Sequence, residues 1–310
     1  MQEKEEGQPV TVDLAIVGHI VLDYITREGR THGPKVGGPC TYAGMAARAL
    51  GASVALVSRV GGDFGYRRLI WFRTHGISVR HVRVTDSATT CFRIDYRNGG
   101  RRMQVTSRCE LIGRQDITTI PLSKAIHIGP VIQEISQSFT RMLSERDSVI
   151  SLDPQGYLRR LAHDGTVLAK KWLGLSVLRK VDVLKVAEDE LQAIAGGTTG
   201  RIALRRLGRL GPEIILLTRG PKGTTLWSRE EGAFHIPAYD AIVQDPTGAG
   251  DALIGAFLVT WIRSGDLLWS ASVGSAVASF VVEMFGPASF GTQRHIESRA
   301  RRIFDGTARL

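Results

Sequence analysis

The stretch Asp245-Pro246-Thr247-Gly248-Ala249-Gly250-Asp251 runs directly into an apolar segment at residues 252–262. A glycine-rich turn that leads into a helix leaves backbone N–H groups unpaired at the helix start, where the helix dipole favours negative charge. A phosphate-sized anion can bind there. The carboxylate of Asp251 is poorly suited to hold phosphate, but it is well placed to take a proton from a hydroxyl that attacks phosphate. The stretch therefore indicates a phosphoryl-transfer site, and the alternative is an ordinary helix N-cap after a flexible turn.

The segments around this stretch alternate between apolar strands and helices. Strands are expected at 12–18, 54–59, 126–129, 148–152, 181–186, 213–218 and 224–228. Helices are expected at 41–50, from about 66 to 74, and at 131–146, 158–177, 188–194 and 201–210. Repeated strand–helix units predict a parallel, doubly wound sheet that binds its ligands at the carboxyl ends of the strands.

Residues 79–107 interrupt this alternation, because no long helix fits there. The turn Asn98-Gly99-Gly100 lies between two strand-like runs and predicts a hairpin. We expect a small β lid formed by residues from about 20–36 and 80–108. Lids of this kind exclude water from phosphoryl-transfer sites. The lid would belong to one α/β domain at 9–310, preceded by a flexible segment at 1–8.

Three other places carry polar or glycine patterns that suit a ligand cleft. Asp23 follows the first expected strand, although a lone aspartate is more often a turn or cap residue. The pair Gly37-Gly38 lets the backbone approach a ligand or act as a hinge. In the turn 218–223, Thr218 offers a hydroxyl and Lys222 a cation for nucleotide phosphates, although an ordinary hairpin explains this turn as well.

The composition is that of a globular protein with many tight turns. The 310 residues carry a formal net charge of +10, with 43% hydrophobic and 23% charged residues and 35 glycines. The basic residues form short dispersed clusters and aromatic residues are only 7%, which argues against a nucleic-acid partner. A positive field that attracts anionic nucleotides or sugar phosphates is the better interpretation.

The cysteines and the apolar segments bear on the cellular location of the protein. Cys40, Cys91 and Cys109 are odd in number and lack metal-ligand spacing, which favours a reducing compartment. The first eight residues are acidic and polar, unlike a secretory signal, and the apolar segments 252–262 and 271–282 are too short to cross a bilayer convincingly. We expect a cytoplasmic protein without a membrane partner.

Taken together, these residues resemble the ribokinase or PfkB family of ATP-dependent carbohydrate kinases. The stretch 245–251 looks like the family's carboxyl-terminal signature, and Val36-Gly37-Gly38-Pro39 is similar to its amino-terminal di-glycine motif. The other motifs follow in the family's order, so the resemblance covers nearly the whole chain. It implies an α/β fold of the ribokinase-like type, in which a three-layer, doubly wound, mostly parallel sheet carries a small β-sheet lid, and it implies a homodimer.

The resemblance also implies roles for individual residues. Asp251 would be the catalytic base, and an anion hole would be formed by Gly248, Ala249 and Gly250. The acceptor, a small polyol, would contact Asp23, Gly37, Gly38 and Tyr42. ATP would be bound by Thr218, Gly220, Gly223, Lys185 and Glu190. The metal sites would be Glu190 for Mg²⁺, and Asp245 and Thr247 for a monovalent ion such as K⁺.

Two departures from the family pattern bear on these roles. Ala187 stands where the family's Asn-x-x-Glu motif has asparagine, which puts the control of metal and phosphate in doubt. Tyr42 stands where ribokinases commonly have a substrate-binding asparagine, which argues against the usual recognition of ribose. The segments 37–44 and 279–283 look like a branch that includes inositol kinases, so myo-inositol is our first acceptor. The alternatives are a nucleoside kinase and a non-catalytic sensor of sugars or nucleotides.

Overall fold

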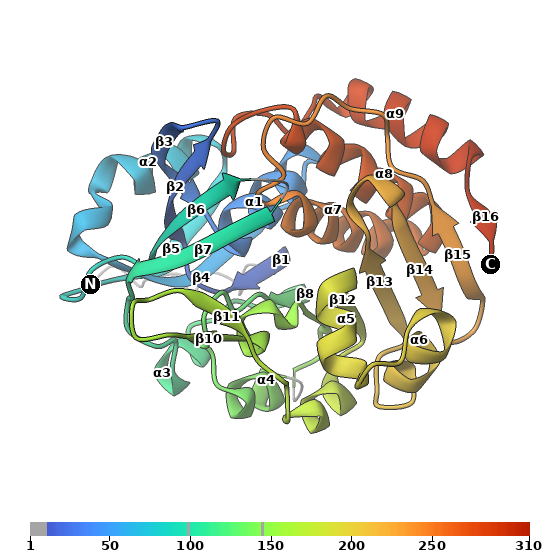
Figure 1. Cartoon of the computed structure of the whole chain (residues 1–310), viewed down its shortest axis with the longest axis horizontal. Coiled ribbons are helices and arrows are strands. Elements are labelled where there is room, and N and C mark those ends of the chain that lie inside the picture. The colour runs from blue at the N-terminus through green and yellow to red at the C-terminus, as the bar shows by residue number, and fades with distance from the viewer. Residues whose placement is uncertain (1–10, 98–99, 144–145) are drawn as a thin grey trace, which may run out of the picture.

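A ten-stranded sheet forms the middle layer of the computed structural model, which describes residues 11–97, 100–143 and 146–310 (Figure 1). Its strands lie in the order β16 (Ala308–Arg309), β15 (Gly232–Ile236), β14 (Thr224–Ser228), β13 (Ile214–Thr218), β12 (Val183–Ala187), β9 (Val149–Leu152), β8 (Ser123–Ile128), β1 (Val12–Val17), β4 (Val54–Gly61) and β5 (Ile77–Thr85). Neighbouring strands are parallel from β5 to β13 and antiparallel from β13 to β16. The predicted doubly wound, mostly parallel sheet is confirmed.

Helices cover both faces of this sheet (Figure 1). One face carries α1 (Pro39–Ala49), α7 (Ala249–Ser264), α8 (Leu267–Val282) and α9 (Gln293–Asp305). The opposite face carries α3 (Arg114–Ile117), α4 (Gln137–Leu143), α5 (Glu188–Ala195) and α6 (Gly200–Gly208), while α2 (Tyr66–Thr74) packs beside β5. Within the part of the chain that the structure describes, no helix is long and apolar enough to cross a membrane.

The central strands are apolar throughout because each of their faces is covered by helices. In β1, Leu14 and Ile16 point into the core under α1 and α7, while Ala15 and Val17 point into the opposite core. All four side chains have no exposed surface. This burial on both sides fixes the register of β1 between β4 and β8, and it brings the carboxyl ends of the parallel strands to one edge of the sheet.

A small sheet of four strands lies beside the large one (Figure 1). Its order is β3 (Arg30–Gly37), β2 (Val21–Arg27), β6 (Cys91–Arg97) and β7 (Gly100–Ser107). The predicted lid segment 80–108 is therefore divided, because residues up to Thr85 belong to β5 in the large sheet. β6 and β7 are antiparallel as the hairpin prediction requires. The turn residues Asn98 and Gly99, and the segment 1–8, lie outside the described residues.

One predicted helix is wrong, and another is shorter than predicted. Residues 158–177 form the hairpin of β10 (Arg159–Leu161) and β11 (Val167–Ala169), followed by a short 3-10 helix at Leu175–Lys180. The hairpin turn contains Asp164-Gly165, and Gly165 has a φ of 80° that a β-turn of this kind requires. The helix expected at 131–146 begins only at α4, because the Glu134 carboxylate accepts hydrogen bonds from the backbone N–H groups of Val131 and Ile132.

Candidate active site

The amino terminus of α7 is shaped by its own loop and by a neighbouring tyrosine. The buried Asp245 accepts a hydrogen bond from the Thr247 N–H at 3.0 Å, which closes the turn. Gly248 precedes α7 with a φ of 81°, and a Cβ atom there would lie 2.3 Å from the ring of Tyr42. Only glycine permits both the backbone conformation and this close approach. The geometry leaves the first N–H groups of α7 at the wall of a cavity.

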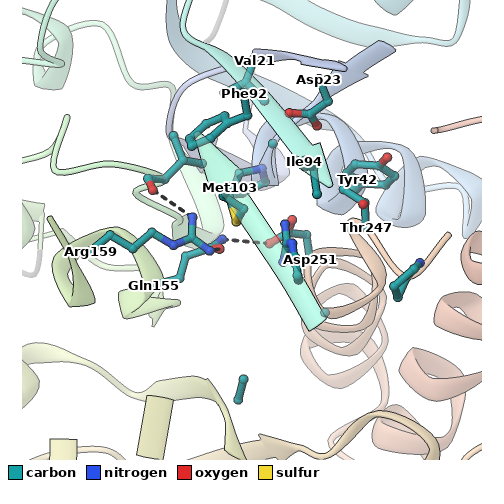
Figure 2. Close-up of a pocket in the computed structure, with 18 of the residues that line it drawn as sticks. Val21, Asp23, Tyr42, Phe92, Ile94, Met103, Gln155, Arg159, Thr247 and Asp251 are labelled. Atoms are coloured by element: carbon teal, nitrogen blue, oxygen red, sulfur yellow. Dashed lines mark hydrogen bonds between the residues drawn. The ribbon is translucent and has the colours of Figure 1, made fainter. Parts of the chain in front are cut away.

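That cavity has a volume of about 250 Å³ (Figure 2). It lies between the small sheet and the carboxyl ends of the parallel strands in the large sheet. Most of the predicted site residues line it. They are Asp23, Gly38, Tyr42, Lys185, Glu190, Thr218, Thr247, Gly248, Gly250 and Asp251. These residues come from both ends of the chain, and the fold brings them into one site.

The remaining predicted residues lie close by but do not line this cavity. Gly37 lies behind Asp23, since a Cβ atom there would be 1.9 Å from its Oδ2 atom. Ala249 opens α7, and Asp245 is buried below the turn. Gly220 lines an adjoining open groove of about 630 Å³, which shares Thr218 and Ala187 with the cavity. Gly223, with a φ of 80°, shapes the turn that borders the groove.

Asp251 lies at the end of a chain of hydrogen bonds (Figure 2). Gln155 donates to its Oδ1 atom at 3.4 Å, and Arg159 donates to the Gln155 Oε1 atom at 2.7 Å. Arg159 also donates to the Val131 carbonyl at 2.9 Å. Burial raises the pKa of Asp251 to about 7, and the Asp153 carboxylate acts in the same direction. A carboxylate with a pKa near 7 is a stronger base than an ordinary aspartate and still loses its proton near neutral pH.

Asp23 and Tyr42 line the cavity on the side away from Gln155 and Arg159 (Figure 2). Asp23 lies on β2 with 3% of its surface exposed, and burial raises its pKa to about 7. The Tyr42 hydroxyl is buried and has no hydrogen-bond partner among the described residues. A buried polar atom without a partner is costly, so the phenol suits a ligand hydroxyl in the cavity.

Lys185 in β12 and Glu190 in the first turn of α5 line the cavity together. The Lys185 ammonium is 2.8 Å from the Asp153 Oδ2 atom. The Glu190 Oε2 atom accepts from the Ala187 N–H at 2.8 Å, and burial raises the pKa of Glu190. Asp189 also lines the cavity. Among the described residues, no group of three or more His, Cys, Asp or Glu side chains is arranged to hold a metal by itself.

The small sheet supplies an apolar wall and a cation. Strand alternation places Phe92, Ile94 and Tyr96 on one face of β6, and the first two line the cavity. The Tyr96 hydroxyl is 3.0 Å from the Thr247 Oγ1 atom, which joins the small sheet to the turn before α7. Arg101 and Met103 reach the cavity from β7. The small sheet thus forms one wall of the cavity that Asp251 also lines.

Three residues that line the cavity were not predicted as site residues: Arg101, Gln155 and Arg159. A signal for two of them was present, because Gln155 and Arg159 follow the carboxyl end of β9, where an open α/β sheet binds its ligands. Arg159 was missed because residues 158–177 were expected to form a helix. Arg101 had no comparable signal, since one arginine in a basic hairpin is usually solvated.

Known proteins are similar to this chain over most of its length. A model of the pfkB family carbohydrate kinases matches residues 13–293. A nucleoside kinase from Methanothermobacter thermautotrophicus is 27% identical over 318 residues, covering 96% of this chain and 96% of that protein. An ATP-dependent 6-phosphofructokinase from Thermoanaerobacterium thermosaccharolyticum is 25% identical over 299 residues, covering 88% of this chain and 89% of that protein. A solved structure of a pyrophosphate-dependent kinase in the ribokinase family, complexed with a pyrophosphate analog and myo-inositol, has a TM-score of 0.80 at 21% identity and covers 92% of this chain and 99% of that one.

Proposed function

The chain belongs to the pfkB family of carbohydrate kinases, and on this premise we propose that it transfers the γ-phosphoryl group of ATP to a hydroxyl of a small sugar or cyclitol. The observation that carries the proposal is the meeting of Asp251 with the amino terminus of α7 in one cavity. A protein that only senses sugars or nucleotides has no need of a buried carboxylate at an anion site.

In the proposed reaction, Asp251 removes the proton from the acceptor hydroxyl. The hydroxyl oxygen forms a bond to the γ-phosphorus as the bond from that phosphorus to the bridging oxygen breaks, and the electron pair leaves with ADP. The N–H groups at Gly248, Ala249 and Gly250 stabilise the charge on the transferred group. Gln155, oriented by Arg159, holds the Asp251 carboxylate toward the acceptor.

The donor would occupy the groove beside Thr218, Gly220 and Gly223, with its phosphates directed toward Lys185. Mg²⁺ is normally held by one or two carboxylates, water and the donor phosphates, so Glu190 and Asp189 at the cavity wall fit it. When bound, Mg²⁺ supplies charge neutralisation on the donor phosphates. Asp245 and Thr247 would border a K⁺ site, and dependence of the rate on K⁺ over Na⁺ would support it.

Asp23, the backbone at Gly37 and Gly38, and Tyr42 would hold the acceptor. The cavity of about 250 Å³ is below the usual size of sites for drug-sized ligands, which favours one small ring. We propose myo-inositol as the first acceptor, since the similar kinase structure holds it. A nucleoside is the second candidate, because one of the similar proteins is a nucleoside kinase.

A panel assay tests this function. Pentoses, hexoses, myo-inositol, sugar phosphates and nucleosides are offered with Mg²⁺ and K⁺, and transfer is followed by phosphorus NMR. Because a similar structure is of a pyrophosphate-dependent kinase, each acceptor is tested with ATP and with pyrophosphate. A polyol that gains phosphate from ATP supports the proposal, and phosphorylation of nucleosides alone would favour the second candidate. Absence of transfer to every acceptor would contradict the kinase assignment.

The pH dependence of the reaction should show the raised pKa of Asp251. The base must be deprotonated, so we expect kcat/KM to rise with pH and to level off above about pH 7. An aspartate with an ordinary pKa would give a flat profile from pH 5.5 upward. The control is Asp23→Asn, which should raise the KM for the acceptor but keep the acid limb. Loss of the limb in that variant would show that Asp23, not Asp251, sets it.

The proposal also covers the oligomeric state of the protein and its location in the cell. We propose a homodimer that pairs through the outer surface of the small sheet, in the cytoplasm. Light scattering that gives the mass of one chain at micromolar concentration would contradict the dimer.

A further inference from the structure

We propose that the Lys185 ammonium contacts the phosphoryl group while it is transferred, and that Asp153 positions Lys185 for this contact. The inference rests on the proposed function and deepens it, because Lys185 then acts in catalysis as well as in holding the donor. Lys185 would stay protonated throughout, so it exchanges no proton and forms no covalent bond.

The position of Lys185 is fixed by the start of α7. A Cβ atom at Gly250 would lie 3.0 Å from both the Cε and the Nζ atoms of Lys185. The ammonium therefore lies directly against the predicted anion hole. Lys185 also lines the same cavity as Gly248 and Asp251, so a phosphoryl group bound at the start of α7 would be within its reach.

Asp153 is held on both sides. Its Oδ2 atom pairs with Lys185, and its Oδ1 atom accepts from the Gln155 N–H at 3.1 Å. The Asp153 side chain is fully buried, and that of Lys185 is 8% exposed. One N–H of the ammonium is thus oriented by Asp153, and two donors remain that can face the cavity.

The surrounding charges keep Lys185 cationic. Burial alone would lower its pKa, but the carboxylates of Asp153, Glu190 and Asp251 outweigh burial and raise it. Two other cations line the cavity: the half-buried Arg159, which donates to Gln155 and the Val131 carbonyl, and Arg101, which reaches the cavity from β7 and is exposed. Ala187 offers only a methyl group toward the donor. Lys185 is therefore the cation best placed to meet charge that develops beside Gly250.

A single variant at Lys185 cannot separate a catalytic role of this residue from a purely structural one, because activity would fall in both cases. If Lys185 served only to neutralise Asp153, its removal would leave a buried charge without a partner, and the enzyme would suffer for that reason. The two roles are separated by a double variant that removes both charges, because that variant contains no unpaired carboxylate.

The experiment compares wild type, Lys185→Met, Asp153→Asn and the double variant, each checked by thermal melting. We expect kcat to fall by about 10² in Lys185→Met and to stay low in the double variant, while the KM for the donor changes far less. The acid limb of kcat/KM should move to higher pH in Lys185→Met, because Lys185 lowers the pKa of Asp251. In Asp153→Asn it should move to lower pH, because Asp153 raises that pKa.

Recovery of kcat to near the wild-type value in the double variant would overturn this inference and leave the proposed function standing. So would a loss that appears only in the KM for the donor. A wild-type protein without turnover in the acceptor panel would overturn the proposed function, and this inference with it. A low kcat in the double variant, with its acid limb near that of wild type, would support the catalytic contact.

Discussion

Replacing Asp251 with asparagine should lower kcat by about 10³ or more, because the amide cannot accept the proton of the acceptor hydroxyl. Asparagine has nearly the same shape and can still accept the hydrogen bond from Gln155. The groove lined by Thr218 and Gly220 is untouched, so binding of ATP measured by calorimetry should change little. Some activity should remain, because the amino terminus of α7 still stabilises the transferred group.

The thermal stability of this variant provides a second check. The pKa of Asp251 is raised to about 7, so above pH 7 the folded protein holds a buried carboxylate that the unfolded chain would hydrate. Asparagine carries no charge, and the melting temperature at pH 8 should therefore stay the same or rise. Asp305→Asn, at the exposed end of α9, serves as the control and should keep full activity. Full activity in Asp251→Asn would disprove the assignment of the base.

The core of this site could be predicted because its chemistry is local in sequence. The turn conformation, the start of α7 and the carboxylate all lie within residues 245–251. This local pattern left two interpretations, a phosphoryl-transfer site or an ordinary helix N-cap, and the order of the other motifs along the chain favoured the first. The strands were predictable for a similar reason. A strand buried on both faces leaves a continuous apolar run, as β1 does.

The neighbours of Asp251 could not be predicted in the same way. Gln155 and Arg159 reach the carboxylate through a contact between residues 96 positions apart, and no local pattern records such a contact. The helix expected at 158–177 was an error of local interpretation, because Asp164-Gly165 within it is a typical hairpin turn sequence. The segment at 131–136 is different, since the buried Glu134 carboxylate binds backbone N–H groups that would otherwise start a helix.

Replacing Gly248 with alanine should abolish most activity, because this position joins the anion hole to the acceptor wall. The added Cβ would lie 2.3 to 2.4 Å from three atoms of the Tyr42 ring, and it would need a φ of 81°. Tyr42 is only 1% exposed and packs in the core, so the turn rather than the ring must move. Displacement of the N–H groups by even 1 Å should lower kcat by about 10² to 10³.

Gly265→Ala separates this contact from backbone strain. Gly265 ends α7 with a φ of 71°, and nothing lies within 4 Å of an added Cβ. Both variants carry the strain of alanine at positive φ, about 1 kcal/mol of unfolding free energy, but only Gly248→Ala meets Tyr42. We therefore expect a similar small loss of melting temperature from strain, a further loss in Gly248→Ala, and normal kcat in Gly265→Ala. Equal activity in the two variants would show that the turn before α7 tolerates displacement, which a precisely placed anion hole would not.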